Sequence, residues 1–474
     1  MHDHDARTTT DALRRVLWWD LLLADDPAAA TPRPPLDGDT TADVVVVGGG
    51  LTGLWTAYYL LEADPALDVL VVEAGRLGAG AAGLATGTAT AGAAGAAAAV
   101  AREHGDRAAR DLSAALRDAV VEVGGVVAAE EVDARFAYGG LVRLARTGPA
   151  VDRLAAAVAD AARRGDDLEL LDPVAAGDRV RADGVLAAAW TPDAAHVDPV
   201  RLIRGLAHVV EARGGRVAER TQALRVAPRA VVTAQGTVRA RQVVLTGGAL
   251  AVAGSPLAVL RRRTQVLATD PLPPRAWAAL ALRAGTTVVE DRHRPLTLVR
   301  TSDDRLVATG AEDVLERVPS LLPDLGPHAV RHVWDAPLTV ARGGRRTVGA
   351  DARAGLAWSA GGDRDAHEGA AVTNLAGRVL ADLLVGADSP LVRLPWVDGA
   401  VGGRARPGRG VARDTVPAVR AVPAVVRGTV RDAVHDTVLG AVRDAAAVWA
   451  DRVEERRGRT SVAAARLLTG PGGA

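Results

Sequence analysis

The residues best suited to chemistry stand near the start of the chain, in a glycine pattern. Three glycines form the spacing GxGxxG: Gly48, Gly50 and Gly53. They come directly after the apolar run Asp43–Val47 and directly before Leu51–Ala63, which has the composition of a helix. In such an arrangement the first glycine permits a tight turn, the second lets backbone approach a pyrophosphate, and the third lets helix and strand pack closely. The start of the helix, Leu51 and Thr52, would present unpaired N–H groups and the positive end of the helix dipole to phosphates.

Glu73 supplies the second half of this pattern. It ends another apolar run, Val69–Glu73, 20 residues after Gly53. An acidic side chain at that place accepts hydrogen bonds from the ribose hydroxyls of a dinucleotide, and a glutamate in place of an arginine disfavours a 2′-phosphate and hence NADP. The plainer interpretation, a glycine-rich turn in an ordinary α/β unit, leaves the register of strand, helix and acid unexplained. We therefore predict a dinucleotide site over residues 43–73.

The elements that must position this site alternate between strands and helices. Further strands are expected at 136–146, 216–219, 221–226, 230–234, 242–245 and 355–360, and helices at 151–164 and 373–384. The stretch Asp198–Gly214 has a proline just inside its start and glycines at its end, which is the punctuation of a helix. This alternation predicts an α/β fold with a parallel sheet. With 474 residues the chain is too long for one compact core, so two domains are expected.

Composition and charge exclude several classes of function. The 57 basic residues, all of them arginine, balance 57 acidic residues, so no overall field attracts nucleic acid or an anionic membrane. The chain has no cysteine, which excludes disulfides and thiolate metal sites, and its ten histidines are scattered without a metal-binding pattern. No stretch approaches the roughly 20 uncharged apolar residues of a membrane-spanning helix, and no targeting segment is evident. We expect a soluble, cytoplasmic protein; the oligomeric state does not follow from the sequence.

The continuation of the glycine pattern resembles one superfamily of flavoproteins. The stretch EAGRLGAGAAGLATG, Glu73–Gly87, is similar to the segment after the second strand in the D-amino acid oxidase and glycine oxidase superfamily of FAD-dependent oxidoreductases. Several blocks look like the gamma-glutamylputrescine oxidoreductase-like branch: TPRPPLDGDTTADVVVVGGGLTGLWTAYYL, RLIRGLAHVVEARGGRVAERTQALRV, TNLAGRVLADLL, LPWV and ADRVEERRGRTS. Together they span nearly the whole chain. The resemblance narrows the expected cofactor to FAD and implies an enzyme that acts on CH–NH donors.

The resemblance also implies a division into domains. A Rossmann-type FAD-binding domain would combine residues 1–100, 196–255 and 346–400, and an inserted α+β substrate domain would combine 101–195 and 256–345. Residues 401–474 would form a linker and a C-terminal helical extension. Apolar residues recur on one face of that extension. A helix docked on the body accounts for this face; a membrane-surface helix does not fit as well, because aspartates interleave with the arginines of the polar face.

Further cofactor contacts are implied at positions that match the family's motifs. These are Arg76, Gly80 and Ala81 in the loop after Glu73, Ala223 in a later strand, Thr246 and Gly247 at a strand end near the pyrophosphate, and Gly369 at the end of the flavin loop. We expect FAD to be noncovalent, since the chain has no cysteine and the loop 75–87 has no histidine.

Some positions depart from the family's pattern. Residues 82–85 (AGLA) replace the polar S-G-R-N at the flavin face, and residues 364–369 (RDAHEG) replace a glycine-rich flavin loop. Leu338 and His367 stand where two arginines clamp a substrate carboxylate in glycine-oxidising relatives. A small zwitterion would lack this clamp, so a small-molecule amine without a carboxylate is the better expectation.

Candidate catalytic residues are few, because a flavin that accepts a hydride needs little acid–base help from the protein. His367 falls in the flavin loop or on the surface. Tyr138, beside two glycines, lines the substrate side or packs in the core. Trp334 lies near the flavin or packs in the core. Two other classes remain as alternatives: a non-catalytic descendant with a binding or structural role, and an NAD-dependent dehydrogenase, which the flavin-like loop after Glu73 disfavours.

Overall fold

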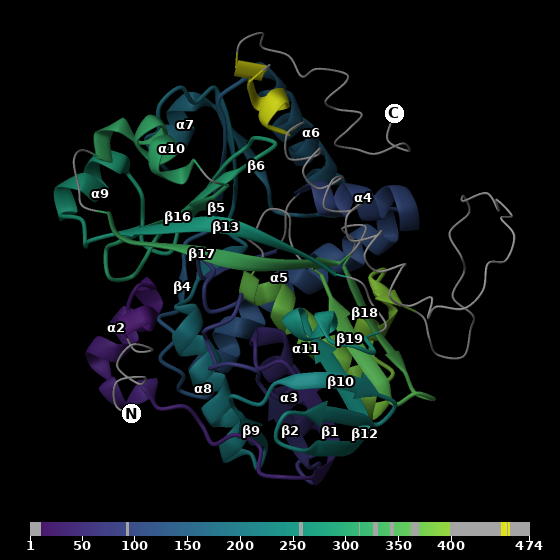
Figure 1. Ribbon diagram of the computed structural model, residues 1–474. Helices are drawn as coiled ribbons and strands as arrows, with labels where there is room; N and C mark the ends of the chain where they lie inside the picture. Colours follow the sequence, from purple (N-terminus) through teal and green to yellow (C-terminus); the bar gives the residue numbers. More distant parts are fainter. Residues whose placement is uncertain are drawn as a thin grey trace, which may run out of the picture.

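The chain folds into two bodies, each built on one large sheet (Figure 1). The computed structural model describes residues 11–91, 94–255, 259–311, 313–325, 330–341, 346–361, 369–398, 447–452, 454 and 455. The first body lies lower in Figure 1 and carries the glycine pattern at the start of α3. The second body lies above it, and the long strands β13 and β17 run along the boundary between the two.

Nine described strands form the sheet of the first body. In order they are β20 (Val397–Asp398), β18 (Thr347–Asp351), β19 (Leu356–Ala360), β12 (Thr237–Thr246), β1 (Thr40–Val47), β2 (Val69–Val72) and β9 (Arg216–Ala218), with β11 (Ala230–Thr233) paired to β12 and β10 (Ala223–Ala227) paired to β11. Strand β1 is parallel to both of its neighbours, with Val45 opposite Val243 on one side and Leu70 on the other. Central parallel strands are covered on both faces, which explains why the run DVVVV does not alternate with polar residues.

Four helices cover one face of this sheet. They are α3 (Leu51–Ala63), α5 (Asp106–Ala129), α8 (Pro199–Ala212) and α11 (Gly369–Val385), and they share a hydrophobic core with β1 and β2. Tyr59 of α3 joins three of them: its hydroxyl donates to Glu122 of α5 and accepts from the Asn374 amide of α11, both at 2.9 Å. The carboxyl ends of the central strands therefore open at one fixed edge, beside the start of α3.

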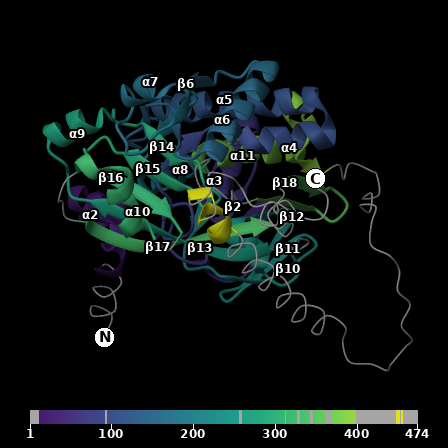
Figure 2. The same ribbon diagram turned by 90° about the horizontal axis from the view of Figure 1, so that it is seen from above.

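The second body is built on a sheet of eight described strands. In order they are β17 (Val330–Ala341), β13 (Val259–Thr269), β16 (Leu306–Gly310), β15 (Leu296–Arg300), β14 (Thr287–Glu290), β5 (Leu141–Ala145), β7 (Ala187–Thr191) and β6 (Glu169–Leu171). All neighbours are antiparallel except β14 and β5. Viewed from above, α7 (Pro173–Gly177), α9 (Pro274–Leu280) and α10 (Val314–Leu321) lie around this sheet (Figure 2).

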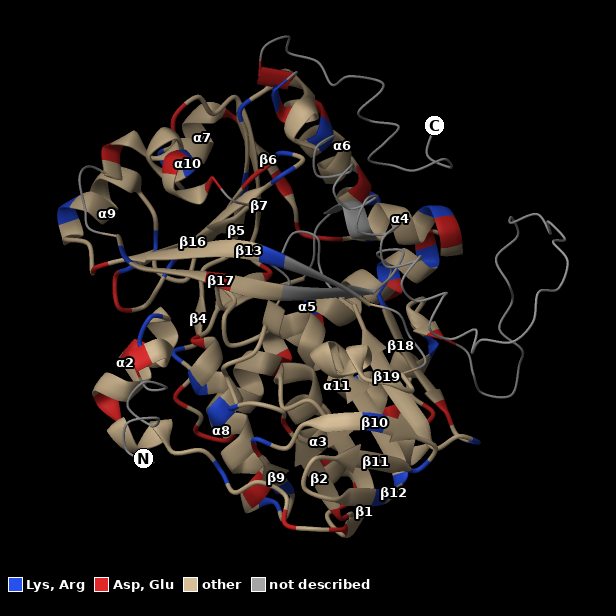
Figure 3. Cartoon of the chain, viewed as in Figure 1, with Lys and Arg blue, Asp and Glu red and all other residues tan. Residues whose placement is uncertain are grey.

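The remaining elements connect the two bodies or lie at their edges. They are α2 (Leu17–Asp25), α4 (Ala94–His104), α6 (Gly148–Arg164), the short sheet β3 (Thr88–Thr90), β8 (Ala194–His196) and β4 (Ala137–Tyr138), and the 3₁₀ turns η1 (Pro27–Ala30), η2 (Gly247–Ala251), η3 (Pro323–Leu325) and η4 (Pro390–Arg393). Arginines and acidic residues are interspersed over the surface helices and loops of both bodies, while the central strands of the first sheet carry few charges (Figure 3).

The α/β fold predicted from the sequence is confirmed, and several expected elements match closely. The predicted helix over 51–63 coincides with α3, and the predicted strands over 230–234 and 242–245 lie within a residue of β11 and inside β12. The helix expected at 373–384 starts earlier, at Gly369. In the part of the chain that the structure describes, no helix has the length and apolar character needed to cross a membrane.

Little of the predicted C-terminal extension falls within the described residues. Residues 447–452 are helical and lie beside α6 (Figure 1). Glu454 is 3% exposed, and its carboxylate accepts from Arg153 at 2.9 Å and lies 2.8 Å from the His293 ring. The Asp451 carboxylate accepts from the backbone N–H of His293 at 3.0 Å. The described part of this segment contacts the second body through buried charges, whereas Trp449 of the expected apolar face is 47% exposed. Residues 401–446 lie outside the described residues.

Candidate active site

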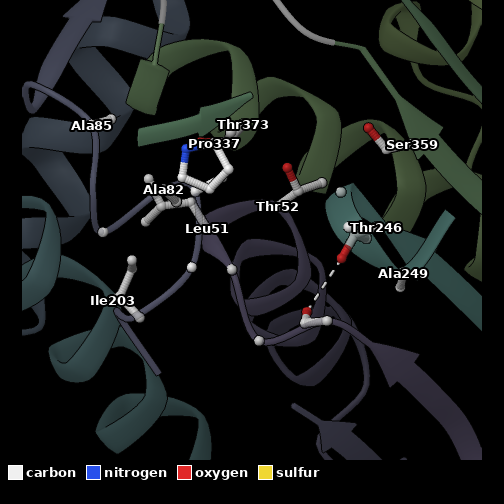
Figure 4. A pocket seen from close by; sticks show the side chains of 18 of the residues that line it. Leu51, Thr52, Ala82, Ala85, Ile203, Thr246, Ala249, Pro337, Ser359 and Thr373 are labelled. Atoms are coloured by element: carbon white, nitrogen blue, oxygen red, sulfur yellow. Dashed lines mark hydrogen bonds between the residues drawn. The ribbon is translucent and has the colours of Figure 1, made fainter. Parts of the chain in front are cut away.

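One cavity of about 760 Å³ lies between the carboxyl ends of the first sheet and the strands β13, β16 and β17 of the second. Its wall includes the turn between β1 and α3, the loop after β2, and the ends of β12 and β19. Figure 4 shows Thr52, Thr246 and Ser359 of the first body and Pro337 of β17 around it. Open α/β sheets bind ligands at the carboxyl ends of their strands, so this cavity is the expected place for a cofactor.

The glycine turn leaves room on its cavity side. Gly48 has a φ of +109°, and a Cβ there would lie 2.8 Å from the Thr246 hydroxyl. A Cβ on Gly53 would lie 2.0 Å from the Gly48 carbonyl oxygen, so this glycine is needed for packing. A Cβ on Gly50, by contrast, would meet nothing within 4 Å. The absence of a side chain at Gly50 is therefore not explained by protein packing, and it fits a ligand that approaches the backbone.

The start of α3 is free of side-chain caps. Gly50 is its N-cap residue and makes no side-chain hydrogen bond, and Leu51 and Thr52 both line the cavity. Helix N-termini carry N–H groups without intrahelical partners and bind anions such as phosphates. The Thr246 hydroxyl holds the turn from the neighbouring strand, donating to the carbonyls of Gly48 at 3.2 Å and Val47 at 3.3 Å (Figure 4).

Glu73 is fixed at the end of β2 on the cavity wall. Its Oε2 accepts from the Gly49 N–H at 2.8 Å, and its Oε1 accepts from the Gly75 N–H at 2.9 Å. An ionised carboxylate has about four acceptor sites, so two bonds leave capacity for further donors. The geometry suits acceptance from ribose hydroxyls.

The other predicted cofactor contacts also reach the cavity. Residues that line it are Gly48, Gly50, Leu51, Thr52, Glu73, Arg76, Gly80, Ala81, Ala223, Thr246, Gly247 and Gly369. Gly53 does not line the cavity, because it lies at the contact between α3 and β1. The Arg76 guanidinium donates to the Ala30 carbonyl, which ties the loop after β2 to the N-terminal segment.

Two of the three predicted catalytic residues, Tyr138 and Trp334, are described, and neither lines the cavity. Tyr138 is 56% exposed and meets Phe136 edge-on, with ring centroids 4.8 Å apart. Trp334 is buried, and its indole N–H donates to the Leu84 carbonyl at 2.9 Å. Tyr138 therefore lies at the surface and does not pack in the core, whereas the buried Trp334 fits the core-packing alternative. His367 lies outside the described residues, and Leu338 is described only as part of β17, opposite Arg262.

The second body contributes wall residues that the sequence did not reveal. They are Thr264, Val266, Thr309, Ala336 and Pro337. The Thr309 hydroxyl donates to the Gln265 carbonyl at 3.0 Å, and the Thr264 hydroxyl donates to the Ala336 carbonyl at 3.4 Å. Both hydroxyls are thus engaged with backbone. Alternation along β13 could have indicated which residues share a face, but not that this face meets the glycine turn.

Two buried ionisable groups flank Val197, which lines the cavity. Burial lowers the pKa of His196 to about 4, and both of its ring nitrogens are without a hydrogen-bond partner among the described residues. Burial raises the pKa of Asp198 to about 7, although it accepts from the first N–H groups of α8 and lies 3.5 Å from the Arg201 guanidinium. His196 is therefore neutral near neutral pH, whereas Asp198 is protonated below about pH 7 and about half ionised at that pH.

Comparison with known proteins decides the family. The family model of the DAO type, FAD dependent oxidoreductase, matches residues 43–383. The chain belongs to this family. It is 31% identical over 381 residues to gamma-glutamylputrescine oxidoreductase of Escherichia coli (strain K12), which covers 75% of this chain and 86% of that protein. FAD is thus the cofactor and the chain is an FAD-dependent oxidoreductase, as the resemblance implied; no finding supports the non-catalytic alternative.

Solved structures show the same fold at low sequence identity. Glycine oxidase from Bacillus cereus ATCC 14579 matches with a TM-score of 0.62 at 18% identity, over 75% of this chain and 98% of that one. L-proline dehydrogenase from P. horikoshii matches with a TM-score of 0.62 at 16% identity, over 75% of this chain and 96% of that one. The predicted Rossmann-type FAD fold is therefore confirmed. The open side of Gly50, the uncapped start of α3 and the fixed Glu73 fit an FAD molecule in the cavity.

Proposed function

We propose that this FAD-dependent oxidoreductase oxidises the C–N bond of an amine that carries no α-carboxylate. The observation that carries the proposal is the wall of the cavity formed by the second body. Its described residues, Thr264, Val266, Thr309, Ala336 and Pro337, include no cation, and the two threonine hydroxyls already donate to backbone carbonyls. A carboxylate placed against this wall would lack the paired donors that arginine supplies.

The first body would hold the cofactor. The backbone from Gly48 to Thr52 would bind the pyrophosphate, and Glu73 would accept from the ribose. Ala223 would lie at the adenine half, and Gly80 and Ala81 would lie along the loop that meets the flavin. Bound FAD supplies a hydride acceptor for the carbon next to the amine nitrogen.

The apolar wall also controls the protonation of the substrate. An amine must be neutral to give up a hydride, because the nitrogen lone pair assists the departure. Removal of water around an ammonium group disfavours its charged form and lowers its pKa. Val266, Ala336 and Pro337 would therefore favour the reactive neutral amine, while an unpaired carboxylate in the same place would carry a cost of roughly several kcal/mol.

The charged side chains among the described wall residues belong to the first body. Glu73 and Arg76 lie at the proposed ribose side. Arg346 precedes β18 and packs at Gly361, where a Cβ would lie 2.8 Å from the arginine Cγ. An amino acid substrate would have to use Arg346 as the cationic partner of its carboxylate. Substitution of Arg346 therefore distinguishes an amino acid substrate from an amine without a carboxylate.

Anaerobic stopped-flow reduction tests the proposal directly. The FAD-loaded protein is mixed with primary and secondary amines and, separately, with glycine, sarcosine and D-alanine. We expect every effective substrate to lack an α-carboxylate, and we expect Arg346→Met to leave the reduction rate by these amines largely unchanged. Faster reduction by an amino acid than by all amines, lost in Arg346→Met, would overturn the substrate proposal and assign the carboxylate site to Arg346.

A further inference from the structure

Three tryptophans hold one short loop of the cavity wall through its carbonyl oxygens. The indole N–H of Trp19 donates to the Gly78 carbonyl at 3.1 Å, and that of Trp18 donates to the Ala85 carbonyl at 2.8 Å. Trp334 of β17 donates to the Leu84 carbonyl at 2.9 Å. A buried indole normally finds an acceptor for its N–H, and here all three acceptors belong to the same loop.

This loop has few other means of holding its shape. Residues 78–85 read GAGAAGLA, so none of its side chains can make a hydrogen bond. Glycines and alanines leave a loop with much conformational freedom to lose. The one large side chain, Leu84, packs against the hydrophobic cluster that contains all three tryptophans. Within the loop, the Leu84 N–H donates to the Gly80 carbonyl at 3.1 Å and the Ala85 N–H to the Ala82 carbonyl at 3.4 Å. Its side-chain-mediated hydrogen bonds all come from outside the loop.

The tryptophan rings contact the loop without lining the cavity themselves. Gly78, Gly80 and Ala82 line the cavity, whereas the tryptophan rings do not. Helix α2, which carries Trp18 and Trp19, lies beside α8 in the first body (Figure 1). The loop is thus in contact with both the cavity and the tryptophan cluster.

The N-terminal segment is itself anchored at the root of the loop. Glu219 is fully buried; its Oε2 accepts from the Arg33 N–H at 2.6 Å and its Oε1 accepts from the Leu77 N–H at 2.7 Å. One carboxylate therefore ties the segment after α2 to Leu77, the residue that precedes the loop. Helix α2 precedes residue 43, where the match to the family begins. The hydrogen bonds from α2 and from Arg33 therefore come from residues outside the stretch that the family model matches.

We propose that α2 is a positioning element of the FAD site. Trp18 and Trp19, together with Trp334 from the second body, hold the loop 78–85 in the conformation that receives the cofactor. The inference rests on the proposed placement of FAD along Gly80 and Ala81, but not on the identity of the amine. We call these three indole hydrogen bonds the tryptophan clamp. Because Trp334 belongs to β17, the clamp also sets the distance between the loop and the wall proposed to meet the substrate.

Conservative substitutions separate the hydrogen bonds from the packing. Trp18→Phe and Trp19→Phe keep an aromatic ring and remove one donor each. Trp277→Phe is the matched control: Trp277 is buried in α9 of the second body, its indole N–H has no acceptor among the described residues, and it does not line the cavity. We expect the dissociation constant for FAD to rise about 2- to 10-fold in each test variant, the factor of one net hydrogen bond. The control should stay within about twofold of the wild type.

A second measurement reads the loop without the cofactor. In the apoprotein, hydrogen exchange of the amides of residues 78–85 should be faster in the Trp18→Phe, Trp19→Phe double variant and unchanged in Trp277→Phe. At saturating FAD, the visible circular dichroism of the flavin should also change in the double variant, a signature that a general loss of stability does not produce. Should the double variant fail to fold, Trp334→Phe provides the same test, because it removes the hydrogen bond that β17 donates to the loop.

Wild-type FAD affinity and wild-type exchange of the loop in these variants would overturn the clamp. The outcome is independent of the substrate: if the tryptophan variants lose FAD affinity as expected but no amine reduces the bound FAD, the proposed function fails while the clamp stands. If amines reduce the flavin at wild-type affinity in every variant, the proposed function stands and the clamp fails.

Discussion

The Glu73 carboxylate accepts a 2.8 Å hydrogen bond from the Gly49 N–H, which closes the end of β2 onto the glycine turn. A second bond, from the Gly75 N–H at 2.9 Å, fixes the other oxygen. The carboxylate is therefore oriented before any ribose is present, and binding need not order it. The proposed ribose acceptor and the proposed pyrophosphate site therefore form one connected unit.

Substitution of Glu73 should release the cofactor without unfolding the protein. We expect Glu73→Ala to fold, because the side chain lies at the cavity, and to retain little FAD after gel filtration. Glu73→Gln is the matched variant: it keeps one carbonyl acceptor and the shape of the side chain but loses the charge-assisted bonds, which are roughly twice as strong as neutral ones. Its affinity should lie between those of the wild type and the alanine variant. Stoichiometric FAD in Glu73→Ala would contradict the assignment of the ribose site.

Gly50 and Gly53 should respond in opposite ways to an added side chain. A Cβ on Gly50 meets nothing within 4 Å, so Gly50→Val should fold normally but place its bulk where the pyrophosphate must lie. A Cβ on Gly53 would lie 2.0 Å from a backbone carbonyl, so Gly53→Ala should unfold well below the wild-type melting temperature. Circular dichroism melts of the apoproteins and the flavin content of the purified proteins measure both effects. Full flavin content in Gly50→Val would place the pyrophosphate elsewhere.

Bound FAD should be released intact by acid. The chain has no cysteine, and no histidine stands in the loop 75–87, so the usual side chains for a covalent link are missing there. After precipitation with acid, we expect the yellow colour in the supernatant and the mass of unmodified FAD. Colour that stays in the pellet would show a covalent attachment.

The parts of the site that are local in the chain could be predicted from the sequence. The turn Gly48–Gly53 and Glu73 lie within 26 residues of one another, and each role follows from the spacing of strand, turn and helix. The part of the loop after Glu73 that lines the cavity could be predicted only from its resemblance to a family. Twelve of the predicted contacts line the cavity because a parallel sheet brings its strand ends to one edge.

The parts that depend on distant contacts could not be predicted. The bond between Trp18 and Ala85 joins residues 67 positions apart, and that between Trp334 and Leu84 joins residues 250 positions apart. No local pattern marks Thr309 as a neighbour of the glycine turn. Tyr138 was singled out because two glycines follow it, and Trp334 because it matches a tryptophan of the family, but neither residue lines the cavity.

Reduced enzyme should react slowly with oxygen. A fixed cation near the flavin stabilises the negative charge that develops on oxygen as it accepts electrons. The chain has no lysine, and the described wall residues of the second body carry no cation. After anaerobic reduction, mixing with aerated buffer should reoxidise the flavin far more slowly than an artificial acceptor such as a quinone does. Comparable rates for the two acceptors would show that another group supplies the charge.

His196 and Asp198 should make opposite contributions to the change of the free energy of unfolding with pH. The pKa of His196 falls from 6.5 to about 4 on folding, so its contribution is fully present above pH 6.5 and is lost as the pH falls towards 4. The pKa of Asp198 rises from 3.8 to about 7, so its contribution is present below pH 3.8 and is lost as the pH rises towards 7. At about 1.4 kcal/mol per pKa unit, each shift changes the free energy of unfolding by a few kcal/mol at most. Between pH 4 and 6.5 the two changes have opposite signs and nearly cancel.

Removal of either group should therefore reveal the pH dependence of stability that the other group contributes. In His196→Leu, a substitution of similar volume beside the Trp18 ring, the free energy of unfolding of the apoprotein should fall as the pH rises from about 4 to 7, because only Asp198 still titrates in this pair. In Asp198→Asn, which preserves a side-chain cap for α8, it should rise over the same range. Urea unfolding at several pH values measures both slopes. Equal slopes in the two variants would show that these residues do not titrate as their burial requires.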